Sequence, residues 1–218
     1  RVQAGWSDVC IGAGVESMTF VPMGGNTPRP HPEYSATNPE AYISMGITAE
    51  NVANRYEISR EDQDKFAANS QEKAARARDN NLFTEIVPTP AVKFVPLADG
   101  SVKKETFMVE ADDGIRVSSP EGLGKLRAVF AAGGSVTAGN SSQTTVGAAV
   151  TIIASAEKCE ELGLKPIAKL VAYNTIGCGS DEMGVGPRYA IPKVLETAGM
   201  TLDQIDIFEI NEAFASQA

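Results

Sequence analysis

The clearest indication of the fold class is the stretch Ile205-Asp-Ile-Phe-Glu-Ile-Asn-Glu-Ala-Phe-Ala-Ser-Gln-Ala218, in which an apolar run meets a helix-forming sequence. The isoleucine-rich half, up to Ile210, favours a buried strand. Glu212 and the residues after it suit the start of a helix, with a carboxylate in the first turn. Asn211 therefore falls at a predicted corner between a strand and a helix.

Two roles for Asn211 follow from this position, and the stretch alone leaves both open. Asparagine is a preferred residue for capping the first turn of a helix. In open α/β sheets, however, ligands bind at the carboxyl ends of strands, so the Asn211 amide could face negative charge that develops on a substrate oxygen.

The residues before this corner complete a strand-helix-strand pattern. Residues 165–172 predict a strand, and the apolar face from Ala190 to Ala198 predicts a helix that ends at Gly199. Such a βαβ unit calls for a parallel sheet whose faces are covered. Two further buried strands are predicted, at Asp8–Ala13 and Ala148–Ala154, and we expect them to lie in one sheet.

The middle of the chain is predicted to hold short helices and edge strands. Thr48 is the expected cap of one helix, and a longer helix runs from Ser59 to the break at Asn80, with a narrow face of small residues around Ser70. Shorter helices are expected at 120–126 and 155–162, and edge strands at 85–87, 92–95 and 107–109.

Composition narrows the functional class. The chain has 218 residues, of which 43% are hydrophobic and 22% charged, so it is long enough for one or two cores. A formal charge of -9 argues against a nucleic-acid surface, and no apolar run has the length of a membrane span. The three cysteines are too far apart in sequence for a disulfide framework or a metal site, which indicates a reducing compartment, with the cytoplasm as the default location.

Five short segments follow one another along the chain: Gly12-Ala-Gly-Val-Glu-Ser-Met18, Met45-Gly-Ile-Thr-Ala-Glu50, Val136-Thr-Ala-Gly-Asn-Ser-Ser142, Met183-Gly-Val-Gly-Pro187 and Asn211-Glu-Ala-Phe-Ala215. In this order they resemble signatures of the thiolases, which join or split acyl groups on coenzyme A. The resemblance implies an α/β fold with a thiolase-like layered core and an inserted loop domain, incomplete in this chain. Coenzyme A would be a substrate, with no cofactor, and the intact protein would be a homodimer or homotetramer in the cytoplasm, a peroxisome or a mitochondrion.

The same resemblance implies a division of the chain. Residues 1–20 and 139–163 would belong to the N-terminal core domain, 21–138 would be the inserted domain that covers coenzyme A, and 164–218 would begin the C-terminal core domain. We expect the inserted part to be the looser of the packed regions.

The resemblance also implies roles for single residues. Asn211 would be catalytic, and the residues that bind substrate would be Ser142, Met45, Met183, Arg116, Leu126 and Ala138. Ser142 would bond the pantetheine arm, Met183 would line the acyl pocket, and Arg116 would lie near the adenine nucleotide. As alternatives, both methionines could be core residues, and Arg116 could be a surface residue paired with a neighbouring aspartate.

The chemistry needs parts that these residues do not supply. A thiolase requires a thiolate nucleophile, a base to activate it and a second acid or base at the α-carbon. By resemblance, those groups belong before Arg1 and after Ala218, so the intact protein is expected to be an acyltransferase and the chain alone to be inactive. His31, the only histidine, lies between two prolines and is not expected to be catalytic. The alternative is a thiolase-like protein that binds acyl-coenzyme A or lipids without turnover.

Overall fold

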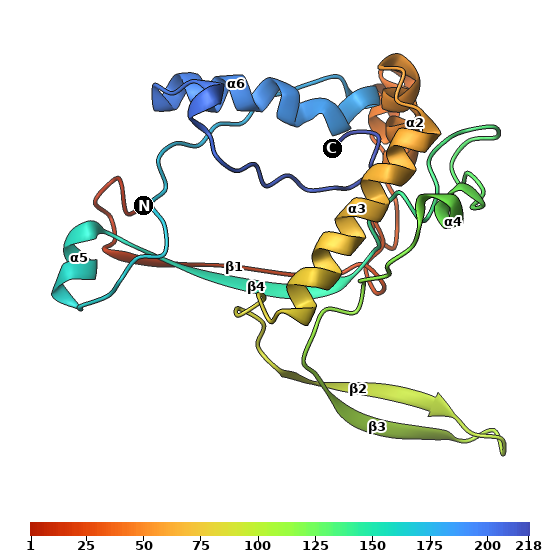
Figure 1. The fold of residues 1–218 in the computed structure, drawn as a ribbon, viewed down its shortest axis with the longest axis horizontal. Coiled ribbons are helices and arrows are strands. Elements are labelled where there is room, and N and C mark those ends of the chain that lie inside the picture. The colour runs from red at the N-terminus through yellow and green to blue at the C-terminus, as the bar shows by residue number, and fades with distance from the viewer.

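The computed structural model describes residues 1–218 and contains two separate antiparallel sheets, each of two strands (Figure 1). In the first, β1 (Val9–Ser17) pairs with β4 (Val146–Ala154), so the beginning of the chain lies beside a segment far along it. In the second, β2 (Thr89–Pro96) and β3 (Val102–Val109) form a hairpin that projects from the rest of the molecule.

The expectation that these two strands lie in one sheet is confirmed, although their bounds differ. We expected the first strand to end at Ala13, but it continues to Ser17, opposite Val146. Extended backbone suits Gly12 and Gly14 as well as any other residue, so neither glycine ends the strand. The expected edge strand at 85–87 is absent, whereas the other two edge strands form the hairpin.

The chain forms six α-helices and three 3-10 helices, and capping residues mark where several of them begin. The α-helices are α1 (Pro32–Thr37), α2 (Met45–Arg55), α3 (Arg60–Asp79), α4 (Pro120–Gly124), α5 (Ala156–Glu161) and α6 (Gly186–Ala198). The 3-10 helices are η1 (Pro39–Tyr42), η2 (Ser180–Val185) and η3 (Leu202–Gln204). Ser59 accepts from the backbone N–H of Asp62 and begins α3, as predicted. The cap of α2 is Ser44 rather than Thr48, whose hydroxyl instead donates to the carbonyl of Met45 at 2.7 Å.

The predicted βαβ unit is wrong in its strands and right in its helix. Helix α6 ends at Gly199, whose φ of 66° is the left-handed conformation that glycine adopts without strain. Residues 165–172 and 205–210 form no strand, and no segment of the chain pairs with either of them. Most of their apolar side chains are exposed, Ile207 at 82%, because no sheet covers them.

The core lies where α2, α3 and residues 135–140 meet. Ala49, Val52 and Ala53 of α2 are buried, and Val136 is completely so. The inserted segment is therefore the better packed part of the chain, contrary to our expectation that it would be the looser one. In contrast, β1 and β4 expose their apolar side chains, so the prediction that these strands are buried is wrong for this chain.

The helices of this chain differ from helices that span a bilayer. A helix that crosses a membrane needs about 20 mostly apolar residues. None of the helices described here combines sufficient length with sufficient apolarity.

Candidate functional site

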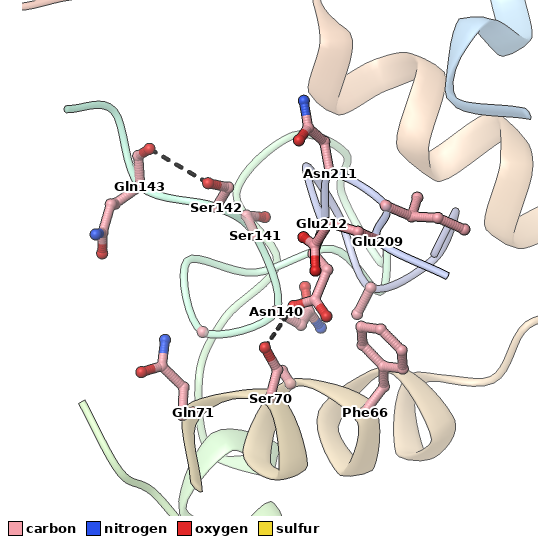
Figure 2. A pocket seen from close by; sticks show the side chains of 14 residues that line it. Phe66, Ser70, Gln71, Asn140, Ser141, Ser142, Gln143, Glu209, Asn211 and Glu212 are labelled. Atoms are coloured by element: carbon pink, nitrogen blue, oxygen red, sulfur yellow. Dashed lines mark hydrogen bonds between the residues drawn. The ribbon is translucent and has the colours of Figure 1, made fainter. Parts of the chain in front are cut away.

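A cavity of about 400 Å³ lies between α3 and two segments that are distant in sequence (Figure 2). One is the loop 139–143, and the other is the run 209–212 with Ala215. The cavity thus brings together two of the signature segments, and with them Ser142 and Asn211.

One face of α3 forms a wall of this cavity. Phe66 and Ser70 are one helical turn apart, and Ala67 and Gln71 complete the same face. The spacing places a hydroxyl and a carboxamide beside the loop 139–143 (Figure 2). The small residues of this face allow the close approach that the sequence predicted.

The loop 139–143 and the segment around Ala213 are joined by backbone hydrogen bonds. The N–H of Ser142 donates to the carbonyl of Ala213 at 2.8 Å, and the N–H of Ala215 donates to the carbonyl of Asn140 at 2.9 Å. Ser141 and Phe214 form an isolated antiparallel bridge between these bonds. The position of Ser142 relative to Asn211 is therefore set by backbone contacts on both sides of the bridge.

Asn211 is not a helix cap. Residues 211–218 form bends and turns instead of the predicted helix, so the capping interpretation is wrong here. The Asn211 side chain is exposed, makes no hydrogen bond within the chain, and points away from α3 (Figure 2). Its amide hydrogens are therefore free to bind a ligand.

The Glu212 side chain, unlike that of Asn211, forms a hydrogen bond within the chain. The hydroxyl of Ser70 donates a hydrogen bond to the Glu212 carboxylate, across the cavity from α3 (Figure 2). Glu209 also lines the cavity, so its wall carries two carboxylates. The helix-start role predicted for Glu212 is replaced by this tertiary contact.

The other predicted binding residues do not line this cavity. Met45 begins α2, and Met183 lies in η2, which packs against α2. Met183 is 46% exposed and Met45 is half-buried, so neither is a fully buried core residue. The structure places the two methionines on neighbouring elements, separate from Ser142 and Asn211.

Arg116, Leu126 and Ala138 lie at the border of the cavity. The backbone N–H of Arg116 donates to the side-chain oxygen of Gln71 at 2.7 Å, and its guanidinium makes no ion pair with a neighbouring aspartate. Leu126 lies against Gly139, where a Cβ would come within 2.6 Å of its side chain. Ala138 is exposed in the same loop.

Ion pairs join α2 to η2. Arg55 donates to the carboxylate of Asp181 at 2.6 Å and also bonds Glu182, which accepts a further bond from the hydroxyl of Tyr56. The hydrogen bond from Arg55 lowers the pKa of Asp181 below its ordinary value. These contacts fix the element that carries Met183.

The three cysteines and the histidine are not assembled into a catalytic pair. His31 caps α1, where its Nδ1 accepts from the N–H of Tyr34 at 3.2 Å. Cys10 lies in β1 and Cys159 in α5, both half-buried, while Cys178 is exposed near the carbonyl of Met183. No cluster of histidine, cysteine or acidic residues in the chain is arranged to hold a metal ion.

Sequence reasoning missed Gln71 and Asn140 as site residues, and it gave Glu212 a different role, at the start of a helix. For Gln71, a signal was present in the helical face around Ser70, which indicated close approach by another element. For Asn140 and Glu212, no local pattern could show that α3 would bind them, because each contact joins residues far apart in sequence.

Comparisons with known proteins agree on one family. The family described as thiolase, N-terminal domain, matches residues 1–157, and that described as thiolase, C-terminal domain, matches residues 164–218. The chain is 47% identical to the peroxisomal 3-ketoacyl-CoA thiolase B of Rattus norvegicus, covering 100% of this chain and 51% of that protein. It is 43% identical to the 3-ketoacyl-CoA thiolase of Bacillus subtilis, covering 100% and 56%. The chain thus spans about half the length of these relatives.

Solved structures agree with the sequence relatives. The dimeric peroxisomal thiolase of Saccharomyces cerevisiae matches with a TM-score of 0.85 and 40% identity, over 99% of this chain and 54% of that one. The acetyl-CoA acetyltransferase from Syntrophomonas wolfei matches with a TM-score of 0.81 and 35% identity, over 99% and 55%. The layered α/β fold expected from the signatures is therefore confirmed, and the chain belongs to the thiolase family.

Proposed function

We propose that the intact protein is a thiolase-type acyltransferase that cleaves 3-ketoacyl-CoA with free coenzyme A, or condenses two acyl-CoA units. The observation that carries this proposal is the free amide of Asn211 at the same cavity as Ser142. The names of the relatives, 3-ketoacyl-CoA thiolases and an acetyl-CoA acetyltransferase, support the same reaction class.

In this proposal Asn211 acts at the carbonyl oxygen of the substrate. Attack on a thioester or ketone places negative charge on that oxygen, and a preorganised N–H donor stabilises the charge. The Asn211 amide has no competing partner in the chain, so it can donate to the oxygen directly or through an ordered water. The nucleophile and bases that complete the reaction are not among the residues assembled here.

The remaining residues would bind coenzyme A and its acyl group, coenzyme A being a substrate and no cofactor being involved. The Ser142 hydroxyl would bond the pantetheine arm, and the two methionines, Met45 and Met183, would face the acyl chain. Arg116, Leu126 and Ala138 would lie nearer the nucleotide. Supporting this order, Arg116 and Leu126 border the cavity, while α2 and η2 lie apart from it.

A homodimer is the assembly we propose for the intact protein, with a homotetramer as the alternative. The support is the yeast relative, which is a dimeric thiolase. For location, several relatives are peroxisomal, which supports a peroxisome as well as the cytoplasm, and mitochondria stay an alternative.

The test is thiolysis by the intact protein. Acetoacetyl-CoA and longer 3-ketoacyl-CoA substrates are supplied with free coenzyme A, and the shortened acyl-CoA and acetyl-CoA are measured. We expect turnover, with Ser142→Ala raising the KM for coenzyme A more than it lowers kcat. Binding of coenzyme A without turnover would instead support a non-catalytic thiolase-like protein.

A further inference from the structure

A buried hydrogen bond joins α3 to the loop that carries Ser142. The Nδ2 of Asn140 donates to Oδ1 of Asp64 at 3.0 Å, and the two residues are 2% and 3% exposed. Hydrogen bonds between two buried side chains are uncommon, and losing one partner leaves the other buried without its hydrogen bond. The contact therefore constrains both residues strongly.

The amide of Asn140 has only one satisfactory orientation. Its Oδ1 accepts from the N–H of Thr137 at 2.7 Å, and its Nδ2 also donates to the carbonyl of Ser135 at 3.1 Å. A flipped amide would place Oδ1 against the carboxylate of Asp64 and the carbonyl of Ser135, with no hydrogen between them. Both donors and the acceptor of the side chain are thus used.

Asp64 is itself fixed by a cation. Its Oδ2 accepts from Nε of Arg60 at 2.8 Å, and Arg60 also donates to the carbonyls of Leu123 and Leu126. The buried carboxylate is therefore paired with a charge on its own helix, which buried carboxylates require. The carboxylate is therefore held by a residue of its own helix as well as by Asn140.

The backbone of Asn140 meets the segment that contains Asn211. Its carbonyl accepts from the N–H of Ala215, and two residues later the N–H of Ser142 donates to Ala213. Asn140 is thus held through its side chain by α3 and through its backbone by the signature segment Asn211–Ala215. A shift of Asn140 would move Ser142 and Asn211 relative to one another.

We propose that Asn140, held by Asp64, is a positioning residue that sets the separation of Ser142 and Asn211 without itself bonding the substrate. This inference rests on the proposed function for its kinetic consequence, although the hydrogen bonds do not depend on it. Catalytic groups must be held within about 0.5 Å of the productive geometry. We therefore expect small displacements here to change both KM and kcat, since Ser142 and Asn211 would act on binding and on the transition state respectively.

The experiment uses exchange of the donor and acceptor. Asn140→Asp puts a carboxylate against Asp64 and the carbonyl of Ser135, whereas the double variant Asp64→Asn with Asn140→Asp restores a donor facing an acceptor. In the intact protein, we expect Asn140→Asp to lower kcat/KM for thiolysis roughly tenfold or more, with both constants changed. The double variant should recover part of that loss. Asn69→Asp, the same chemical change at an exposed position of α3, should have no such effect.

Hydrogen exchange at the amides of Ser142 and Ala215 provides a readout that does not need activity. We expect both amides to exchange faster in Asn140→Asp, while amides within α2 keep their rates. If Asn140→Asp does not fold, Asn140→Ala removes the same bonds without adding charge and is expected to act in the same direction.

The outcomes separate the two proposals. If the intact parent protein showed no thiolysis, the proposed function would be refuted. The hydrogen-exchange rates of the Ser142 and Ala215 amides would still test the positioning role of Asn140. An active parent whose Asn140 variants keep normal kcat and KM, or variants with unchanged exchange at Ser142 and Ala215, would overturn the positioning role. A loss that the double variant does not reduce would overturn the pairing with Asp64.

Discussion

Ser70 on α3 donates a hydrogen bond to the carboxylate of Glu212, the residue that directly follows Asn211. Asp64, on the same helix, binds Asn140, two residues before Ser142. Helix α3 thus holds a residue next to Asn211 and a residue close to Ser142 in the sequence. The helix is long and well capped at Ser59, so it can serve as the fixed reference for both segments.

Ser70→Ala should therefore lower kcat, although in our proposal the Ser70 side chain does not contact the substrate. The variant removes one side-chain bond, and the resulting freedom of the Glu212 segment should lower kcat about fivefold in the intact protein, the rate equivalent of one net hydrogen bond. Ser70→Thr keeps the hydroxyl and serves as the control. Equal kcat values for the alanine variant and the parent would show that the contact does not position Asn211.

Substitution of Asn211 separates catalysis from stability. Because residues 212–217 form no helix and the Asn211 side chain has no partner, Asn211→Ala should change the free energy of unfolding by less than about 0.5 kcal/mol. Turnover by the intact protein should fall roughly a hundredfold in Asn211→Ala, and at least as far in Asn211→Asp, which places a negative charge where negative charge develops.

Asn69→Ala, at an exposed position of α3, is the matched control for both variants and should retain full turnover. Thermal melting and steady-state kinetics on the same preparations provide the comparison. An Asn211→Asp variant with near-normal turnover would remove Asn211 from the catalytic residues.

Local sequence signals predicted several of the helix ends correctly. Ser59, Ser155 and Gly199 mark helix ends because the chemistry of a cap is contained within a few residues. The edge strands predicted at 92–95 and 107–109 also form, as parts of β2 and β3, although their pairing in a hairpin was not predicted. The residues that determine these elements lie within the elements or directly beside them.

The failures arose where structure depends on distant partners. Residues 165–172 and 205–210 have strand composition, yet a strand needs a neighbour to receive its hydrogen bonds, and none pairs with them in this chain. The contacts of Asn140 and Glu212 with α3 could not be predicted for the same reason, because they join residues far apart in the sequence. The signatures placed Ser142 and Asn211 near one cavity, but the helix that holds their neighbours could be found only in the structure.

Glu50 is predicted to be important for stability. This carboxylate is 4% exposed and accepts from the backbone N–H groups of Ser135 and Val136, each at 2.9 Å. Glu50→Gln replaces one acceptor by an NH2 group that faces an N–H donor. We expect a loss of about 1–3 kcal/mol in the free energy of unfolding, measured by denaturant titration.

Glu57→Gln is the control for Glu50→Gln, because Glu57 is exposed and makes no side-chain hydrogen bond or ion pair. It should unfold close to the parent value. If the two variants were equally stable, the Glu50 contacts would contribute nothing net to the core.

The contact of Arg55 with Asp181 should make the free energy of unfolding depend on pH in the acid range. The pKa of Asp181 is lower in the folded state because Arg55 donates to its carboxylate. Its contribution to stability is therefore complete above the unfolded pKa, about 3.9, and is lost as the pH falls through the lower folded pKa. The stability difference between the parent and Asp181→Asn should be constant near neutral pH and should shrink below about pH 4.

Asp206→Asn tests whether this acid dependence is specific. Asp206 is exposed and forms no ion pair, so its substitution should leave the pH profile of stability unchanged. A profile of Asp181→Asn that stays parallel to the parent throughout the acid range would contradict the assigned role of Arg55.

The 218-residue chain alone is expected to show no thiolysis. A thiolase needs a thiolate activated by a base, and the only histidine is engaged at its Nδ1 by the N–H of Tyr34. None of the three cysteines bonds a basic side chain, and the most accessible, Cys178, has only the carbonyl of Met183 nearby. The purified chain should therefore release no acetyl-CoA from acetoacetyl-CoA and free coenzyme A. Turnover that Cys178→Ala abolished would show instead that a nucleophile is already present among these residues.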